Sequence, residues 1–181
     1  MVTARQITVE DLEANPRDGL WELIDGELVD VTPASDEPSS TGITIAFLLV
    51  QHVRPARLGR VYGADGGFVL FPDRNTLLVP DVSFVTAERA PKGEARKKFP
   101  RLAPDLVVEV LSPSDRMAGA LAKIAMYLDA GVRLVWLVDP ASRTVTIFRP
   151  EAMPSKLGVG DTLGGGDVLP EFSVPIAEIF A

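Results

Sequence analysis

The sequence predicts an α/β or α+β domain in which helices flank a mixed β-sheet, and this single domain is expected to span residues 1–181. Two observations carry the prediction. Five of the six residues in Leu106–Leu111 are aliphatic, which is typical of a strand covered on both faces. Apolar residues at helical spacing then follow from about Arg116 to Ala130, with strand-like runs before and after. Strands and helices that alternate in this way build a sheet with helices packed against it.

The N-terminal part predicts a short helix followed by a β-hairpin. Thr8 and Asp11 have the spacing of a capping box, which would open the helix. Two strand-like runs, 20–24 and 27–31, are separated by Asp25-Gly26. A two-residue Asp-Gly link between such runs is the strongest short-range signal for a hairpin.

A second helix is expected after a polar loop at residues 33–41. Ser40 or Thr41 would cap this helix, which runs to about Val53. Its apolar residues fall on most sides, so we expect it to be well buried.

The remaining elements alternate strands with the helix near residues 116–130. Strands are expected at 60–62, 67–71, 77–85, 106–111, 132–138 and 144–149. A short helix is expected near residues 176–180. In the helix over 116–130, the buried stripe is expected at Met117, Leu121, Ile124 and Leu128.

Composition excludes several kinds of chemistry. The chain has no cysteine, which removes disulfides, thiolate nucleophiles and cysteine-based zinc sites. Its single histidine is His52. We therefore expect neither a multi-histidine metal site nor a histidine-based catalytic triad within one chain. A formal net charge of −7 argues against a protein that coats nucleic acid nonspecifically. Any chemistry must therefore use carboxylates, lysine, serine, threonine or tyrosine.

We expect a cytoplasmic protein with no membrane partner. The N-terminal residues lack the apolar core of a signal peptide. No apolar run approaches the ~20 residues that a membrane span needs.

Two carboxylates interrupt apolar strand-like sequence. Glu109 lies in the middle of Leu106–Leu111, and Asp81 lies within the run 77–85. An ionised carboxylate in such a place costs several kcal/mol unless a cation or strong donors meet it. If the two strands are neighbours, the acids can converge on one divalent cation. Mg²⁺ is the metal expected, with Mn²⁺ as an alternative.

Basic residues supply candidates for contacts with phosphate. Residues 86–103 hold six Lys or Arg against two Glu, so a local basic surface exists despite the overall charge. Lys97, Lys98 and Arg101 are the candidates for binding nucleic acid. Lys123 and Tyr127 share one face of the following helix, from which Lys123 would reach back over the end of the Glu109 strand. Taken alone, each basic residue also fits an ordinary solvated surface.

Three segments together resemble the Uma-type family of restriction endonucleases, within the PD-(D/E)XK nuclease superfamily. They are Trp21–Val29, Val79–Val85 and Leu106–Ser114, and the later Lys123–Val132 and Val135–Pro140 strengthen the match. The resemblance spans about Thr8 to Phe180. It implies a restriction-endonuclease-like core with an N-terminal helix and β-hairpin. It also implies a Mg²⁺-dependent endonuclease acting on DNA, and we expect a homodimer.

The resemblance implies roles for individual residues. Asp81 and Glu109 would be metal ligands, joined by the backbone carbonyl of Val110, and Glu22 would be an auxiliary acid near the metal. The superfamily lysine expected two residues after Glu109 is Leu111 here. Lys123 would take its place, so the catalytic residues implied are Asp81, Glu109 and Lys123.

Three functions remain open at this point. The leading interpretation is a metal-dependent endonuclease that hydrolyses phosphodiester bonds. The second is a catalytically inactive nucleic-acid-binding or assembly protein that keeps the nuclease fold. The third is a nuclease-like partner of a mobile element that needs another subunit. Taken alone, Glu22 in an edge hairpin also fits an ordinary cross-strand charge partner.

Overall fold

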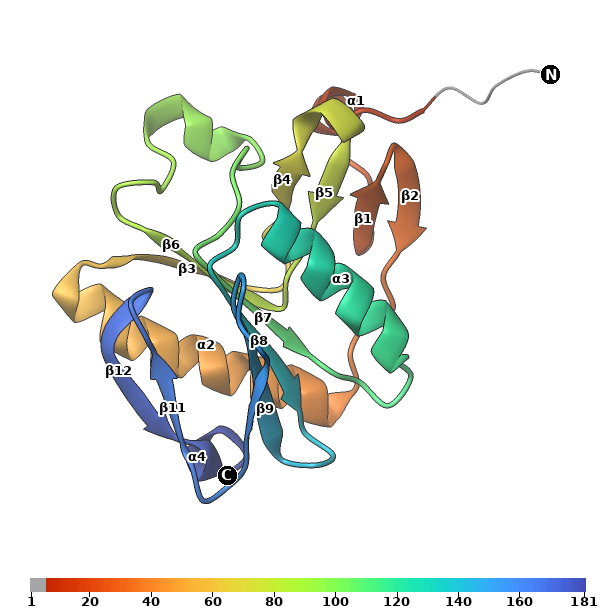
Figure 1. The fold of residues 1–181 in the computed structure, drawn as a ribbon. Helices are drawn as coiled ribbons and strands as arrows, with labels where there is room; N and C mark the ends of the chain where they lie inside the picture. Colours follow the sequence, from red (N-terminus) through yellow and green to blue (C-terminus); the bar gives the residue numbers. More distant parts are fainter. Residues whose placement is uncertain (1–5) are drawn as a thin grey trace.

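A six-stranded mixed sheet with helices on both faces forms the centre of the molecule (Figure 1). The computed structural model describes residues 6–181, so the first five residues of the expected domain lie outside the described part. The strand order is β10-β9-β8-β7-β6-β3. Its strands are β3 (Gly59–Tyr62), β6 (Val82–Thr86), β7 (Leu106–Val110), β8 (Leu134–Asp139), β9 (Thr144–Phe148) and β10 (Ser155–Leu157). The predicted mixed sheet with flanking helices is confirmed.

Parallel pairing occurs between β7 and β8, and the other neighbours in this sheet are antiparallel. Helix α3 (Met117–Asp129) connects β7 to β8 and crosses one face of the sheet. Its Ile124 and Tyr127 pack into the apolar core on that face. Because β7 is central, its side chains are covered on both sides, as the aliphatic run predicted.

A second sheet has the order β2-β1-β5-β4 and lies beside one end of the first. Its strands are β1 (Trp21–Ile24), β2 (Glu27–Asp30), β4 (Phe68–Phe71) and β5 (Thr76–Leu78), with the short 3₁₀ helix η1 (Pro72–Arg74) between the last two. The predicted hairpin is confirmed: Asp25 and Gly26 both have positive φ, 50° and 79°, as a two-residue turn of this kind requires. Helix α1 (Val9–Ala14) precedes it with the predicted capping box.

The prediction of a single strand over residues 77–85 is wrong. Leu77 and Leu78 end β5 in the second sheet, whereas β6 begins at Val82 in the first. Pro80 between them has no N–H to donate to a ladder, so the chain changes sheets there. Asp81 therefore lies at the junction of the two sheets.

Helix α2 (Asp36–Ala56) starts earlier than expected, at the N-cap Ser35. Polarity predicts a loop over residues 33–41, but residues 36–41 form the start of the helix, with Pro38 in its first turn. Proline is tolerated in the first turn of a helix, where the backbone N–H groups have no intrahelical acceptor. The polar loop therefore ends at Ser35.

The expectation that α2 is buried on most sides is also wrong. One stripe, at four-residue spacing, packs into the core: Thr41, Ile45, Leu49 and Val53. On another face, Ile43 and Phe47 are 68% and 58% exposed. The apolar composition of the helix thus serves two faces, of which only one meets the sheet.

The stripe expected on α3 is wrong in part. Ile124 is buried, but Met117 and Leu121 are 50% and 44% exposed. Tyr127 is fully buried instead. The buried face is rotated toward Tyr127, whose hydroxyl has a polar partner in the sheet.

The C-terminal part covers the α2 face of the sheet. The hairpin of β11 (Thr162–Gly165) and β12 (Leu169–Pro175) and the short helix α4 (Ile176–Ile179) pack into the same core as α2. The remaining short element is the 3₁₀ helix η2 (Gly93–Lys97), in the basic loop. Within residues 6–181, no helix combines the length and apolarity needed to cross a bilayer.

Candidate active site

A cleft of about 1340 Å³ opens where the two sheets meet, and it contains most of the predicted site residues. Asp81, Glu109, Val110 and Lys123 all line it. They come from the start of β6, from β7 and from α3. The carboxylate of Glu22, on β1, contacts Lys123 from the side of the second sheet.

The two predicted acidic residues lie next to each other across neighbouring strands: Glu109 is on β7, and Asp81 directly precedes β6. Val82 pairs with Val108, so continuing the antiparallel register by one residue places Asp81 opposite Glu109. The Val110 amide donates a 2.7 Å hydrogen bond to Asp81 Oδ2. This bond holds the Asp81 carboxylate at the end of β7, next to Glu109.

Lys123 links two carboxylates. Its Nζ lies 2.9 Å from Glu22 Oε1 and 3.1 Å from Glu109 Oε1. The side chain is 22% exposed, so this ammonium remains accessible from the cleft. Lys123 thus reaches the end of the Glu109 strand, as its position on the helix predicted.

Tyr127 is a member of the cluster that sequence reasoning left without a role. Its hydroxyl donates a 2.6 Å hydrogen bond to Glu109 Oε1. Tyr127 and Lys123 are one helical turn apart, and both contact the same carboxylate. That spacing was the available signal, but only the contact identifies the tyrosine's partner.

Glu22 is held by the second sheet. Its Oε1 accepts a 2.9 Å hydrogen bond from the Val79 amide and also contacts the Lys123 ammonium. The side chain is buried. This oxygen is therefore committed to Lys123 and to the backbone, which suits a residue that fixes the lysine.

The charges in the cluster depend on one another. Burial raises the pKa of Glu109 to about 7; Lys123 opposes the rise, and the charge of Asp81 adds to it. Burial also raises the pKa of Asp81, against the hydrogen bond from Val110. Burial alone would lower the pKa of Lys123, but the charges of Glu109 and Glu22 outweigh it and raise that pKa, so the residue stays cationic. An added cation would favour the ionised form of both carboxyl groups.

The oxygen ligands available in the cleft suit a hard divalent cation that takes only part of its coordination shell from the protein. Among residues 6–181, no group of three or more Asp, Glu, His or Cys side chains is arranged to hold a metal. Two carboxylates, Asp81 and Glu109, remain, and Val110, whose carbonyl the family resemblance implies as a ligand, lines the same cleft. Mg²⁺ is commonly bound by one or two carboxylates, with water and substrate phosphate oxygens completing its octahedron. The site therefore fits Mg²⁺ and does not fit a metal that needs nitrogen or sulfur ligands.

Two of the three basic-loop residues that are predicted to bind nucleic acid line the cleft. Lys97 and Lys98 line it, and their side chains are 73% and 67% exposed. Arg101 does not line it. It forms ion pairs with Glu10 and Glu13 of α1 instead, which fasten the loop to that helix.

Asp105 follows a proline, as Asp81 does, but has a structural role. Asp105, just before β7, is buried and accepts a 2.8 Å hydrogen bond from the Thr86 amide. Arg89 and Arg133 pair with the same carboxylate at 2.7 and 3.0 Å. Asp105 therefore ties three segments together, and it is not one of the residues lining the cleft. The Pro-Asp dipeptide alone could not separate it from Asp81.

The fold and the cleft define a restriction-endonuclease-like α/β protein. The chain belongs to the Uma2 family, described as "Putative restriction endonuclease", whose model matches residues 8–177. This is the family that the sequence motifs resemble. Among curated proteins, none matches the chain.

A solved structure has the same fold. It is a crystal structure of a protein from Anabaena variabilis ATCC 29413 described as a "putative nuclease belonging to DUF820". It superposes with a TM-score of 0.83 at 22% sequence identity, over 96% of this chain and 97% of that one.

Proposed function

We propose that this protein is a Mg²⁺-dependent endonuclease that hydrolyses phosphodiester bonds in DNA, in the cytoplasm, with Mn²⁺ as an alternative metal. The observation that carries the proposal is the convergence of Asp81, Glu109 and Lys123 on one cleft from three separate elements. Membership of a family of restriction endonucleases supports DNA as the substrate.

Each residue has a distinct task in this proposal. Asp81, Glu109 and the Val110 carbonyl would hold the metal, which when bound supplies a Lewis acid and an activated water. Lys123 would orient or help deprotonate the attacking water, or stabilise the charge that develops on the phosphate. Glu22 holds the lysine in place, and its role as an auxiliary metal ligand remains a prediction.

Cleavage of supercoiled plasmid and of labelled oligonucleotides tests the proposal. Wild-type protein is compared with Glu109→Ala in Mg²⁺, in Mn²⁺ and in EDTA. We expect metal-dependent cleavage by the wild type alone. Cleavage that persists in EDTA, or that is equal in Glu109→Ala, would contradict the assignment.

One observation favours the rival function, an inactive nucleic-acid-binding or assembly protein. The Lys123 ammonium already bridges Glu22 and Glu109, so those two charges are compensated by the protein itself. In that case, the chain would bind nucleic acid without cleaving it under any metal condition. The same assay, read together with a binding measurement, separates the two functions.

We further propose that the protein is a homodimer formed through α2. Ile43, Phe47 and Val50 are exposed on that helix at spacings that place them close together on its surface. Apolar residues gathered in this way are typical of protein–protein contacts. In a symmetric dimer, the exposed apolar residues of α2 in one copy would pack against the same residues of the second copy.

A further inference from the structure

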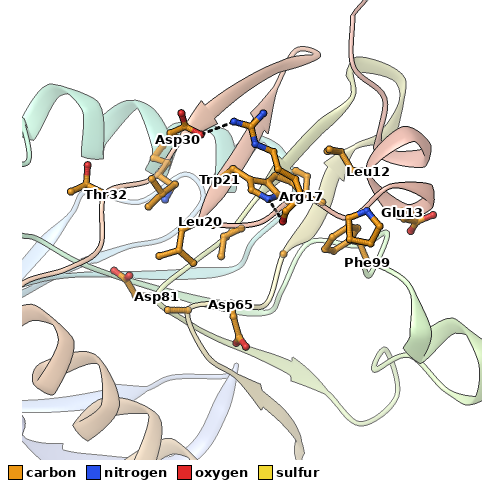
Figure 2. A pocket seen from close by; sticks show the side chains of 18 of the residues that line it. Leu12, Glu13, Arg17, Leu20, Trp21, Asp30, Thr32, Asp65, Asp81 and Phe99 are labelled. Carbon is orange, nitrogen blue, oxygen red and sulfur yellow. Dashed lines mark hydrogen bonds and ion pairs between the residues drawn. The ribbon is translucent and has the colours of Figure 1, made fainter.

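We propose that the cleft takes an unpaired DNA strand, whose bases stack on apolar and aromatic side chains that line the same cleft as the acidic cluster. This inference rests on the proposed nuclease function and specifies the form of its substrate. These side chains, which we call the wall, are Leu20, Trp21 and Phe99, and they line the same cleft as Asp81, Glu109 and Lys123. Figure 2 labels these three side chains among those that line the cleft, with Asp81 on the side of Leu20 and Phe99 on the other side of Trp21.

The two rings of the wall are held in a fixed arrangement. Trp21 and Phe99 meet edge to face, with ring centroids 6.1 Å apart. The Trp21 indole N–H donates a 3.3 Å hydrogen bond to the Arg17 carbonyl, so the ring's polar atom has a partner in the protein. Leu20 beside them is 42% exposed. The rings are therefore already ordered, and a base that stacks on them need not order them.

Apolar ring surface in a cleft suits unpaired bases better than a duplex. In double-stranded DNA the base faces are stacked on one another, and proteins meet only base edges, sugars and phosphates. Proteins that bind single strands instead stack bases on aromatic side chains, with little dependence on sequence. The wall would thus contribute nothing to a continuous duplex.

The basic side chains around the wall are already in ion pairs with carboxylates. A bound DNA strand would replace these carboxylates with its phosphates. Arg17 pairs with Asp30, Lys97 with Glu94 and Lys98 with Glu13. The Arg17–Asp30 and Lys97–Glu94 pairs are exposed on both sides and contribute at most about 1 kcal/mol each, so phosphates can replace these carboxylates at little cost. Glu13 is only 13% exposed and keeps Arg101 as a partner when Lys98 leaves it. Because these cations are not free, stacking would carry a large share of the affinity, and the salt dependence of binding should be shallow.

The test compares a short DNA strand with the same strand annealed to its complement, both titrated in EDTA. Wild type, Trp21→Leu and Phe99→Leu are measured beside Tyr62→Leu as the matched control. Tyr62 also forms an edge-to-face pair, with Phe68, but does not line the cleft. We expect the wild type to prefer the unpaired strand. Loss of either ring of the wall should weaken that binding by roughly 5- to 150-fold, and Tyr62→Leu should not.

Intrinsic fluorescence provides a second reading that needs no variant. The chain has two tryptophans, and Trp136 is fully buried, so Trp21 is the one a bound base can reach. Emission should be quenched by the unpaired strand and much less by the duplex. Unchanged emission on binding of the strand would overturn the inference even if Trp21→Leu proved too unstable to study.

Cleavage of both DNA forms in Mg²⁺, measured in parallel, separates the two proposals. Equal or tighter binding of the duplex, or normal binding of the strand by both wall variants, would overturn the inference. Metal-dependent cleavage of the duplex in that case would leave the nuclease function standing. Failure to bind or cleave either form would overturn both.

Discussion

The hydroxyl of Tyr127 donates a 2.6 Å hydrogen bond to Oε1 of Glu109, the same oxygen that lies 3.1 Å from the Lys123 ammonium. One carboxylate oxygen is thus fixed by two donors from one face of α3. The orientation of a predicted metal ligand therefore depends on helix α3, which follows its strand in the chain.

Replacement of Tyr127 by phenylalanine tests that dependence. The variant loses the donor while keeping the ring, and a hydrogen bond to a charged group contributes about 1.5–3 kcal/mol. We expect cleavage to fall by roughly tenfold or more and the Mg²⁺ concentration for half-maximal rate to rise. The chain's other tyrosine, Tyr62, provides the control, because Tyr62→Phe should alter neither quantity. Wild-type Mg²⁺ dependence in Tyr127→Phe would show that the hydroxyl does not position Glu109.

Lys123→Met should remove most cleavage. If the ammonium stabilises charge in the transition state, its loss costs about 10²–10³ in rate. Lys156→Met, on the exposed strand β10, is the matched control and should cleave normally. The further change Leu111→Lys in the Lys123→Met protein asks whether the ammonium can act from the usual superfamily position. Full activity of Lys123→Met alone would refute the migrated-lysine assignment.

The same substitution should also lower stability, because Glu22 and Glu109 lose their shared cation. Removing one partner of a buried ion pair costs about 3 kcal/mol or more. Adding Glu22→Gln should recover part of this loss, since one uncompensated carboxylate disappears. Urea denaturation of the single and double variants measures both effects. A double variant less stable than Lys123→Met would contradict the pairing.

Asp105→Asn should destabilise the protein without changing its chemistry. Burial would raise the pKa of Asp105, but the Thr86 amide, Arg89 and Arg133 together outweigh it and lower that pKa. The carboxylate therefore stabilises the fold above its ordinary pKa of about 4, and this contribution is lost as the pH falls through the lowered folded value. We expect a loss of about 1–3 kcal/mol near pH 7 that shrinks in acid.

The pH dependence of unfolding, compared with wild type from neutral pH into acid, measures that difference. Folded Asp105→Asn should cleave DNA at the wild-type rate, because the residue does not line the cleft. A difference in stability that grows as the pH falls would contradict the sign of the shift.

The expected homodimer can be tested at the exposed stripe of α2. Phe47→Glu places a charge in the middle of that stripe and should shift the protein to a monomer in light scattering coupled to size exclusion. Lys156→Met serves again as a distant surface control. A wild-type protein that is monomeric at all concentrations would contradict the dimer, and an unchanged dimer in Phe47→Glu would remove α2 from its interface.

Much of the core was readable from local sequence. The aliphatic run around Glu109 predicted a central covered strand, and Asp25-Gly26 predicted the hairpin that carries Glu22. In both cases the signal lies in a few adjacent residues whose backbone preference and burial agree. The pattern of carboxylates within apolar runs likewise identified Asp81 and Glu109, because an isolated buried acid is costly wherever the fold places it.

Other features depended on contacts between distant segments. Pro80 divides the run 77–85 between two sheets, which a hydrophobic pattern cannot reveal because both halves are equally apolar. The composition of the basic loop predicts that Arg101 binds nucleic acid, yet Arg101 pairs with Glu10 and Glu13, which precede it by about ninety residues. The composition of the basic loop gave no sign of those partners.

The sequence by itself determined which residue types could do chemistry and which strand would hold Glu109. Only the tertiary structure decided how each charge is compensated: Lys123 between Glu22 and Glu109, Tyr127 on Glu109, and Asp105 with its two arginines. The physical reason is that periodicity and propensity report a residue's immediate backbone and burial. The partner of a buried charge is chosen by packing between elements far apart in the chain.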